Sequence, residues 1–307
     1  MKKTLLLSAV CLPLFFSCTQ EARKAEGKQT KNKPPLSDTT TAPPAPPIKP
    51  VEITYHPLRM NDSGKKQFHA YAEEQQALIL ALNRLDAAHL WKADTLVVPD
   101  TFLTDRNAYS TFPKSVADLK EVKKIILFSY PSQTYGVYEN GQLLKWGPTS
   151  MGKKSTKTPR GLFFTNWKGK EVRSSIDREW VLKWNFNIQN KMGVGWHQYA
   201  MPGYPASHSC LRLYADEAKF LYEWADQWKL KNGELIAKGT PVIVFGEYPF
   251  GERKPWLNLL EDGKALTHSE EEIREVVQPH LATILSEQAI SEQVRTQQAI
   301  ADTAKAK

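Results

Sequence analysis

The chain has 307 residues, of which 41% are hydrophobic and 24% are charged. This composition can form a buried core, and it excludes collagen-like, wholly disordered and multi-span membrane proteins. The formal net charge is +8, a mild excess for this length. Because no compact basic run stands beside an aromatic motif, we expect a solvated basic surface and no nucleic-acid partner.

The first residues have the pattern of an export signal. Two lysines precede an apolar run from Leu5 to Phe16, which is too short to span a bilayer as a helix. The run ends at Ser17-Cys18, which resembles a bacterial lipoprotein signal. That resemblance implies a signal peptide over residues 1–17 and a lipid on the Cys18 sulfur. We therefore expect an exported protein, held at a bacterial membrane by its N-terminal lipid and facing the periplasm. An ordinary secretory signal cleaved nearby is the alternative.

Cysteine is scarce, with only Cys11, Cys18 and Cys210 in the chain. Three cysteines exclude a small disulfide scaffold and a zinc site of the CxxC type. If Cys11 leaves with the signal and Cys18 carries lipid, the mature protein keeps a single thiol. A lone thiol in an exported protein is a buried small hydrophobe, an intermolecular bridge or a working nucleophile.

Composition then divides the rest of the N-terminal part. Residues 18–50 contain seven prolines among polar residues and predict an extended, disordered tether. Residues 51–115 predict a small α/β module, in which a helix over 72–85 precedes a short strand over 94–99. The helix, the Leu82-Asn83 pair and the strand weakly resemble the second half of a LysM glycan-binding module. A purely structural subdomain is the alternative.

Residues 118–250 read as a mainly β domain with minor α structure. Asn140-Gly141 predicts a type I′ turn between two strands of a hairpin over 135–144. Asp216 is expected to cap a helix that runs to Trp228. Further strands are expected over 125–130, 161–164 and 242–245. Residues 251–307 predict a helical polar tail, with one or two peripheral helices interrupted by Pro279.

The residues around the single mature thiol carry the chemistry. Cys210 follows His197 by thirteen residues and His208 by two, and Arg212 lies just beyond it. A neighbouring imidazole can take the thiol proton and leave a nucleophilic thiolate. An arginine offers a bidentate grip on a carboxylate. A buried structural cysteine with two satisfied histidines is the alternative.

This pattern resembles the L,D-transpeptidase catalytic domain, the YkuD family, over about residues 121–247. The family motif is a histidine, a loop, and then Ser-His-Gly-Cys-x-Arg or Asn. The matching residues here are His197, Ser207, His208, Cys210 and Arg212. Gly152 and the Thr158-Pro159-x-Gly161 turn also look like the family's turn ahead of the site. Ser209 stands where the family has glycine, and the loop after His197 is shorter than usual.

The resemblance implies a β-sandwich catalytic domain and a role for each residue. Cys210 is expected to be the nucleophile, His197 the proton acceptor and donor, and His208 a support for the Cys210 loop. Backbone N–H groups near Ser209 would hold the oxyanion. The residues expected to bind substrate are Arg212, Ser209, Ser207 and Trp196. Because these groups suffice and no metal-ligand spacing is visible, neither a metal nor another cofactor is expected.

The implied function is transfer of a peptidoglycan stem peptide through a cysteine thioester to an amine acceptor. One alternative is an L,D-carboxypeptidase or amidase on the same fold, with water as acceptor. A second is an inactive wall-binding lipoprotein, which Ser209 would explain. A cysteine peptidase of the NlpC type is disfavoured, because that family places its cysteine before its histidines.

Overall fold

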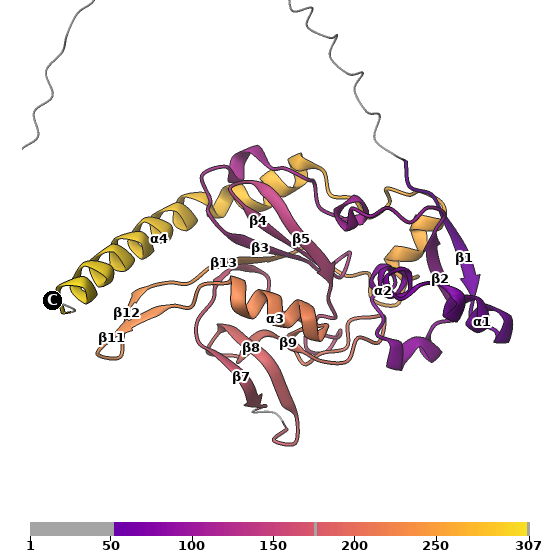
Figure 1. Cartoon of the computed structure of the whole chain (residues 1–307), viewed down its shortest axis with the longest axis horizontal. Helices are drawn as coiled ribbons and strands as arrows, with labels where there is room; N and C mark the ends of the chain where they lie inside the picture. Colours follow the sequence, from indigo (N-terminus) through magenta and orange to yellow (C-terminus); the bar gives the residue numbers. More distant parts are fainter. Residues whose placement is uncertain (1–51, 175–176, 306–307) are drawn as a thin grey trace, which may run out of the picture. The chain divides into compact units, whose positions relative to one another are not determined.

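The computed structural model describes residues 52–174 and 177–305 (Figure 1). The expected signal peptide, the tether and Cys18 lie outside these residues. The described residues form one compact unit. Across the described residues, no helix combines the length and the apolar character needed to cross a membrane.

Two β-sheets form the centre of this unit. A five-stranded sheet has the order β5-β4-β3-β13-β6, in which β3 and β13 are parallel and the other pairs are antiparallel. Its strands are β3 (Ile125–Ser129), β4 (Thr134–Glu139), β5 (Gln142–Pro148), β6 (Gly161–Phe164) and β13 (Pro241–Phe245). A four-stranded sheet has the order β10-β9-β8-β7, in which β9 and β10 are parallel. Its strands are β7 (Lys168–Arg173), β8 (Val181–Gln189), β9 (Val194–Gln198) and β10 (Leu211–Leu213). A separate ribbon pairs β11 (Lys229–Lys231) with β12 (Glu234–Ala237). The predicted mainly β fold with minor α structure is confirmed.

Strand β3 explains how the five-stranded sheet is packed. Its side chains alternate between two faces, and all five residues are buried. Ile126 and Phe128 belong to the core shared with the four-stranded sheet. Ile125 and Leu127 belong to a second core on the other face. An unbroken apolar run is therefore required here, because both faces of the strand are covered.

The hairpin between β4 and β5 has the turn that its sequence predicts. Asn140 and Gly141 have φ of 47° and 75°, which are the two positive values of a type I′ turn. A Cβ on Gly141 would lie 2.6 Å from the backbone oxygen of Val116. Glycine is thus required at this position both by conformation and by space.

Helix α3 (Ala215–Trp224) differs from its prediction at both ends. Tyr214 occupies the N-cap position without a side-chain hydrogen bond, and Asp216 lies inside the first turn. The predicted Asp216 cap is therefore wrong, although a carboxylate there still favours the helix dipole. The helix also ends before Trp228. Ala218 and Leu221 are fully buried in the core between the sheets.

Helix α4 (Glu270–Lys305) is one continuous helix that includes Pro279. Its residues Ile273, Val277 and Ile284 are buried against the second face of the five-stranded sheet. The sequence predicted one or two peripheral helices, whereas the first half of this single helix is part of the core. Three widely spaced apolar residues are enough because they lie on one face of the helix.

The N-terminal module has the order β1 (Tyr55–Arg59), α1 (Asp62–Ala70), α2 (Glu73–Leu82) and β2 (Thr95–Pro99), and β1 pairs antiparallel with β2. The predicted helix and strand are both present. The Asn83 amide joins them, because it donates to Val97 O and accepts from Val97 N at 2.9 Å each. Residues of α2 also pack with Trp146 of β5. Short 3₁₀ helices complete the chain: η1 (Ala87–Lys92), η2 (Arg106–Tyr109), η3 (Ala117–Leu119) and η4 (Pro255–Leu260).

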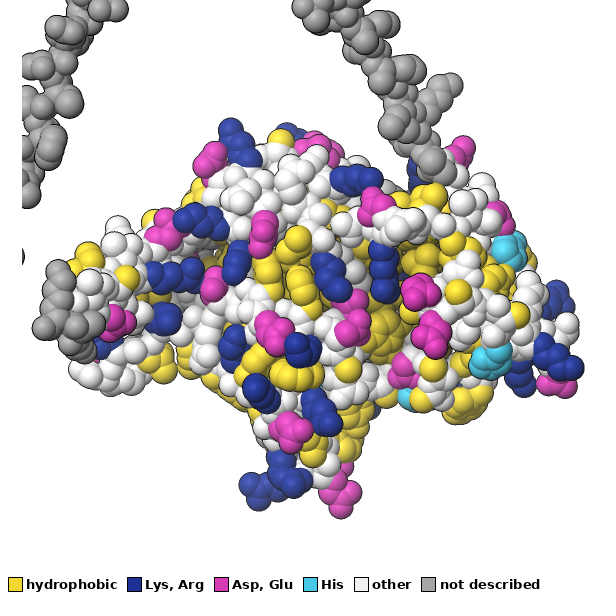
Figure 2. Space-filling view, viewed as in Figure 1, with side chains coloured by type: hydrophobic (Ala, Val, Ile, Leu, Met, Phe, Trp, Pro, Cys, Tyr) yellow, Lys and Arg dark blue, Asp and Glu magenta, His cyan; other side chains and the backbone are white. Residues whose placement is uncertain are grey.

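Charged side chains are mixed on the face of the molecule that Figure 2 shows. Lys and Arg lie among Asp and Glu over most of this face, so the net positive charge is not gathered into one patch there. This distribution is that of an ordinary solvated surface.

Candidate active site

The parallel pairing of β9 and β10 brings the first two candidate residues together. His197 of β9 lies opposite Arg212 of β10, and Trp196 lies opposite Leu211. Because neighbouring side chains on a strand point to opposite faces, His197 and Arg212 share the outer face of the sheet. Trp196 points inward instead. It is fully buried, with its ring 4.8 Å from that of Phe186.

The loop that carries Cys210 is fastened to the segment between β5 and β6. Ser207 N donates to Met151 O at 3.0 Å, and Lys153 N donates to Ser207 O at 3.0 Å. The Thr158 hydroxyl donates to Ser209 O at 2.9 Å. A Cβ on Gly152 would lie 2.2 Å from a backbone oxygen, so only glycine allows this close approach. The turn residues that the sequence singled out ahead of the site therefore support the Cys210 loop.

Ser209 has a φ of 85°, in the region that favours glycine. The structure thus requires a positive φ where the related family has glycine and this chain has serine. Such a residue costs about 1–3 kcal/mol when its surroundings hold it in place. The Ser209 hydroxyl offsets part of this cost, because it donates to Thr156 O at 3.2 Å.

A narrow pocket of about 30 Å³ opens beside the thiol. Five of the predicted site residues line it together: His197, Ser207, His208, Cys210 and Arg212. The β7–β8 hairpin supplies the remaining wall through Ser174, Trp180 and Leu182, and Tyr199 completes the lining. Ser209 and Trp196 are not among the lining residues. For Trp196 the structure indicates a role in the core rather than in substrate contact.

Burial sets the protonation states of Cys210 and His197. Burial raises the pKa of the Cys210 thiol above its ordinary value, against smaller opposing effects of the Gly195 backbone and of Arg212. Burial also lowers the pKa of His197 to about 4. Both changes favour the neutral thiol and neutral imidazole at pH 7. The resting site therefore holds an uncharged pair rather than a preformed thiolate.

The His197 ring has a defined orientation. Its Nδ1 lies 3.1 Å from Gln198 O, an acceptor only, so Nδ1 carries the proton and donates. Nε2 is then the unprotonated nitrogen, which can accept a proton. Within the described residues, neither histidine is a hydrogen-bond partner of Cys210 Sγ, which lies 3.9 Å from Gly193 O. Apo geometry of this kind does not exclude a general base, because such bonds tighten when substrate binds.

His208 has a different environment from His197. Its Nε2 lies 3.2 Å from Lys153 Nζ, and its ring lies 5.5 Å from the Trp180 ring. Because the ammonium can only donate, Nε2 accepts and Nδ1 carries the proton. Nδ1 is buried and has no hydrogen-bond partner among the residues the structure describes. His208 therefore lines the pocket with one N–H that has no partner in the described protein.

Arg212 is a partly buried cation at the same pocket. Its guanidinium lies 4.6 Å from the centre of the Tyr199 ring, and Nη1 lies 3.4 Å from Ala200 O. Burial lowers its pKa from the ordinary arginine value, and the group stays charged because that value is very high. Its positive charge favours the thiolate of Cys210 and disfavours the imidazolium of His197. Its remaining N–H groups suit a substrate carboxylate.

Two backbone amides complete the constellation. In the described part of the chain, the N–H groups of Ser209 and Cys210 donate to no protein acceptor. Donors of this kind next to a nucleophile stabilise the oxyanion of acyl transfer by about 3–4 kcal/mol each. The Ser207 hydroxyl has another use, because it donates to Cys210 O at 2.5 Å and holds the loop. Ser207 is therefore a positioning residue.

Sequence reasoning did not identify Tyr199, which lines the pocket, or Lys153, which contacts His208 from outside the lining. Tyr199 lies two residues after His197 and so points to the same side, a period-2 signal that could have identified it. Lys153 meets His208 across 55 residues, and no local pattern announces that contact. Over residues 52–174 and 177–305, no group of three or more His, Cys, Asp or Glu side chains could hold a metal ion.

The part of the chain that carries this pocket is similar to a known protein family. Residues 123–244 match the family model described as YkuD, the L,D-transpeptidase catalytic domain. This match includes every pocket residue named above and confirms the resemblance seen in the Cys210 motif. None of the curated proteins matches the chain.

Among solved structures, an L,D-transpeptidase from Stackebrandtia nassauensis is 24% identical, with a TM-score of 0.34, over 41% of this chain and 57% of that one. One from Mycobacterium smegmatis is 23% identical, with a TM-score of 0.33, over 40% and 59%. One from Mycobacterium tuberculosis H37Rv is 19% identical, with a TM-score of 0.32, over 50% and 72%. The chain thus spans less than two thirds of the length of the first two.

Proposed function

We propose that the chain is a peptidoglycan L,D-transpeptidase with Cys210 as its nucleophile, because residues 123–244 match the model of the L,D-transpeptidase catalytic domain. The observation that carries this proposal is the pocket that Cys210, His197 and Arg212 share. Beside it lie two backbone N–H groups that donate to no acceptor in the described protein. Cys210 is also the free cysteine of the described residues. The proposed substrate class is the peptidoglycan stem peptide.

The first half-reaction forms a thioester. Nε2 of His197 takes the Cys210 proton as the sulfur attacks the carbonyl carbon of an L-to-D peptide bond. The Ser209 and Cys210 amides hold the oxyanion. The carbon–nitrogen bond then breaks, and the departing D-residue amine takes the proton from His197. Because the resting pair is neutral, we expect proton transfer to accompany attack rather than precede it.

The second half-reaction transfers the acyl group. An acceptor amine attacks the thioester carbonyl and loses a proton to His197, and the carbon–sulfur bond breaks. The Cys210 thiolate recovers its proton from His197. If water attacks instead, the same pocket performs carboxypeptidase or amidase chemistry, since only the acceptor differs.

Substrate recognition is proposed for the two pocket groups with spare donors. Arg212 is placed to bind a stem-peptide carboxylate, and Nδ1 of His208 to donate to a substrate oxygen. A volume of about 30 Å³ has room for about one water molecule.

The direct test incubates the protein from Glu52 onward with purified tetrapeptide muropeptides. We expect an acyl adduct on the intact protein, loss of the terminal D-residue, and a cross-linked or hydrolysed product by mass spectrometry. Cross-linked product indicates an amine acceptor, whereas the tripeptide alone indicates water. Cys210→Ala removes one sulfur atom and should abolish every product while leaving the circular dichroism spectrum unchanged. Turnover by that variant would rule out the cysteine mechanism.

An inactive wall-binding protein is the second candidate, because Ser209 replaces the family glycine at a positive φ. It predicts binding of the protein to sacculi without an acyl adduct. Ser209→Gly is the informative variant. Activity that appears only in Ser209→Gly would favour the inactive candidate for the natural chain.

We also propose export and lipid anchoring, on the pattern of residues 1–18 and the Pro-rich segment after them. Cys18→Ala should move the protein from the membrane pellet to the soluble fraction, or leave an uncleaved precursor. Two or more acyl chains give stable anchoring where one is marginal. Cys11→Ala is the matched control, and we expect it to fractionate like the parent. Identical fractionation of Cys18→Ala and the parent would instead favour a plain secreted form.

A further inference from the structure

Arg84 is a buried cation that the proposed catalytic chemistry does not use. Its side chain is 1% exposed, at the junction between the N-terminal module and the catalytic domain. The described groups whose charge reaches it are the phenols of Tyr214, Tyr55 and Tyr248, and no carboxylate is among them. Buried charges in proteins are ordinarily paired. This one has no anionic partner in the described protein.

The hydrogen bonds of Arg84 use two of its three guanidinium nitrogens. Nε donates to Ser132 O at 2.9 Å, Nη1 donates to Leu82 O, and the guanidinium stacks on Trp256 at 5.0 Å. Nη2 is buried and has no hydrogen-bond partner within residues 52–174 and 177–305. Arg84 also has a φ of 56°, which is unusual for a bulky residue. Strain of this kind persists where the surroundings over-determine the residue, often at functional sites.

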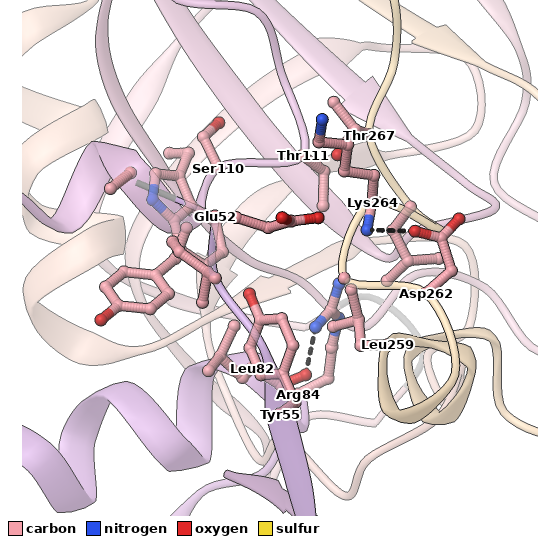
Figure 3. Close-up of a pocket in the computed structure, with 16 residues that line it drawn as sticks. Glu52, Tyr55, Leu82, Arg84, Ser110, Thr111, Leu259, Asp262, Lys264 and Thr267 are labelled. Atoms are coloured by element: carbon pink, nitrogen blue, oxygen red, sulfur yellow. Dashed lines mark hydrogen bonds between the residues drawn. The ribbon is translucent and has the colours of Figure 1, made fainter. Parts of the chain in front are cut away.

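Arg84 lines a cavity of about 230 Å³, which Figure 3 shows in close-up. The guanidinium lies between Tyr55 and Leu259, with Glu52, Lys264 and Asp262 above it in this view. The volume is below the roughly 300–1,000 Å³ of pockets for drug-sized ligands. It exceeds the space of a single water several-fold. The cavity therefore fits a small molecule.

The charges of the cavity are arranged from inside to outside. Arg84 is the buried cation, while Glu52, Asp262 and Lys264 are exposed. These are the four charged residues in the described lining, two of each sign. Nη2 can hold one oxygen of an anion at the inner end, and the two carboxylates can hold a cation at the mouth. A phosphate carries two negative charges and would be repelled by both carboxylates.

From this arrangement we propose that the Arg84 cavity is a binding site for a small zwitterion of the amino-acid class. The ligand carboxylate accepts from Nη2 of Arg84, and the ligand ammonium lies near Glu52 and Asp262. The site is separate from the Cys210 pocket and shares no lining residue with it. The proposal does not rest on the transpeptidase chemistry, and either can fail without the other.

The test is titration calorimetry of the full chain with L-alanine and D-alanine. We expect at least one enantiomer to bind with a dissociation constant of about 1 mM or below. Acetate, which lacks the ammonium, should bind at least tenfold more weakly, and methylammonium should not bind. No binding of either enantiomer, or tighter binding of inorganic phosphate than of alanine, would overturn the proposal.

Variants locate the site. Arg84→Met should weaken alanine binding at least tenfold, and Arg212→Met, the matched control in the catalytic pocket, should leave it unchanged. If Arg84→Met does not fold, Thr267→Trp takes its place, because this exposed lining residue can fill the mouth. Glu52→Gln should weaken alanine binding several-fold while leaving acetate binding unchanged. Alanine binding that survives Thr267→Trp but is lost in Arg212→Met would place the ligand at Cys210 and refute the Arg84 site.

Discussion

The Cys210 pocket and the Arg84 cavity both bury ionisable side chains, but burial has opposite consequences in the two places. Burial raises the pKa of Cys210 and lowers that of His197 to about 4, so both groups are neutral at pH 7. Burial lowers the pKa of Arg84 only to about 9, so the guanidinium stays charged. Between the two sites, Asp86 and Met201 exchange hydrogen bonds: Asp86 N donates to Met201 O, and Met201 N donates to the Asp86 carboxylate.

The difference shows what burial does to groups of different intrinsic basicity. A thiol or an imidazole can avoid the cost of a buried charge by exchanging a proton. An arginine cannot, so it needs a partner. The first site therefore acquires charge only when a substrate reacts, whereas the second carries a permanent charge that an anionic group would satisfy.

The largest expected effect is on turnover in His197→Gln. The amide keeps a hydrogen-bond donor near Gln198 O but cannot take the thiol proton. We expect acyl transfer from muropeptides to fall by about 10²–10⁴-fold, the usual contribution of a general base. The circular dichroism spectrum and the alanine affinity should not change. If His208→Gln loses this much activity and His197→Gln does not, the two histidines have exchanged roles.

Alkylation of Cys210 by iodoacetamide tests whether the resting thiol is neutral. Because burial raises its pKa, the rate should climb about tenfold per pH unit from pH 7 to 8.5. His197→Gln should follow the same curve, since a neutral imidazole does not stabilise the thiolate. A rate that is already level at pH 6 would reveal a preformed thiolate and remove the contrast between the two sites.

Burial of His197 should also make the free energy of unfolding depend on pH. Its pKa is about 4 folded and 6.5 unfolded, so the unfolded state binds more protons between these values. Stability is therefore complete above pH 6.5 and decreases towards pH 4, by about 3 kcal/mol in total. The measurement is urea unfolding across this range for the parent and for His197→Gln, which should lack the decrease.

The comparison with the variant is necessary because a second buried group titrates in the opposite sense. Burial raises the pKa of Glu217 to about 7, so its contribution to stability is lost as pH rises from 4.5 to 7. Subtracting the His197→Gln curve cancels that contribution. Parallel curves for parent and variant would mean that His197 is not titrated differently in the folded state.

The smallest expected effect is the relief of strain in Ser209→Gly. Glycine adopts a φ of 85° without steric cost, which stabilises the folded state. Two effects oppose this gain: the Ser209 hydroxyl bond to Thr156 O is lost, and glycine makes the unfolded chain more flexible. We expect a net gain of about 1 kcal/mol in the free energy of unfolding. Asn232→Gly is the control, because Asn232 has a φ of 54° in an exposed turn and asparagine tolerates that region. An equal gain in both variants would show that Ser209 carries no special strain.

The fold was predictable wherever a local pattern decides the outcome. The unbroken apolar run of β3 and the Asn140-Gly141 turn each specify their element within a few residues. Helix boundaries were less predictable: Asp216 suits an N-cap by residue type, yet Tyr214 takes that position. The contribution of α4 to the core was also missed, because its apolar residues are sparse and their burial depends on a distant sheet.

The candidate site likewise contains residues that the sequence could predict and one that it could not. His197, His208, Cys210 and Arg212 could be recognised because motif residues lie within sixteen positions of one another, and one strand pairing brings them together. Trp196 could not be assigned, because adjacent strand residues face opposite sides and only the register shows which side holds the site.

Sequence alone thus determined the strand-rich domain, its hairpin and the composition of the thiol site, since turn chemistry and short spacings are properties of neighbouring residues. Tertiary structure alone decided the protonation of the Cys210–His197 pair, the strain at Ser209 and the unpaired charge of Arg84. Burial and hydrogen bonding between distant segments set these properties: Arg84 meets Ser132 and Trp256 across 48 residues and more. No local pattern records how much water such contacts exclude, and that exclusion determines what each buried charge costs.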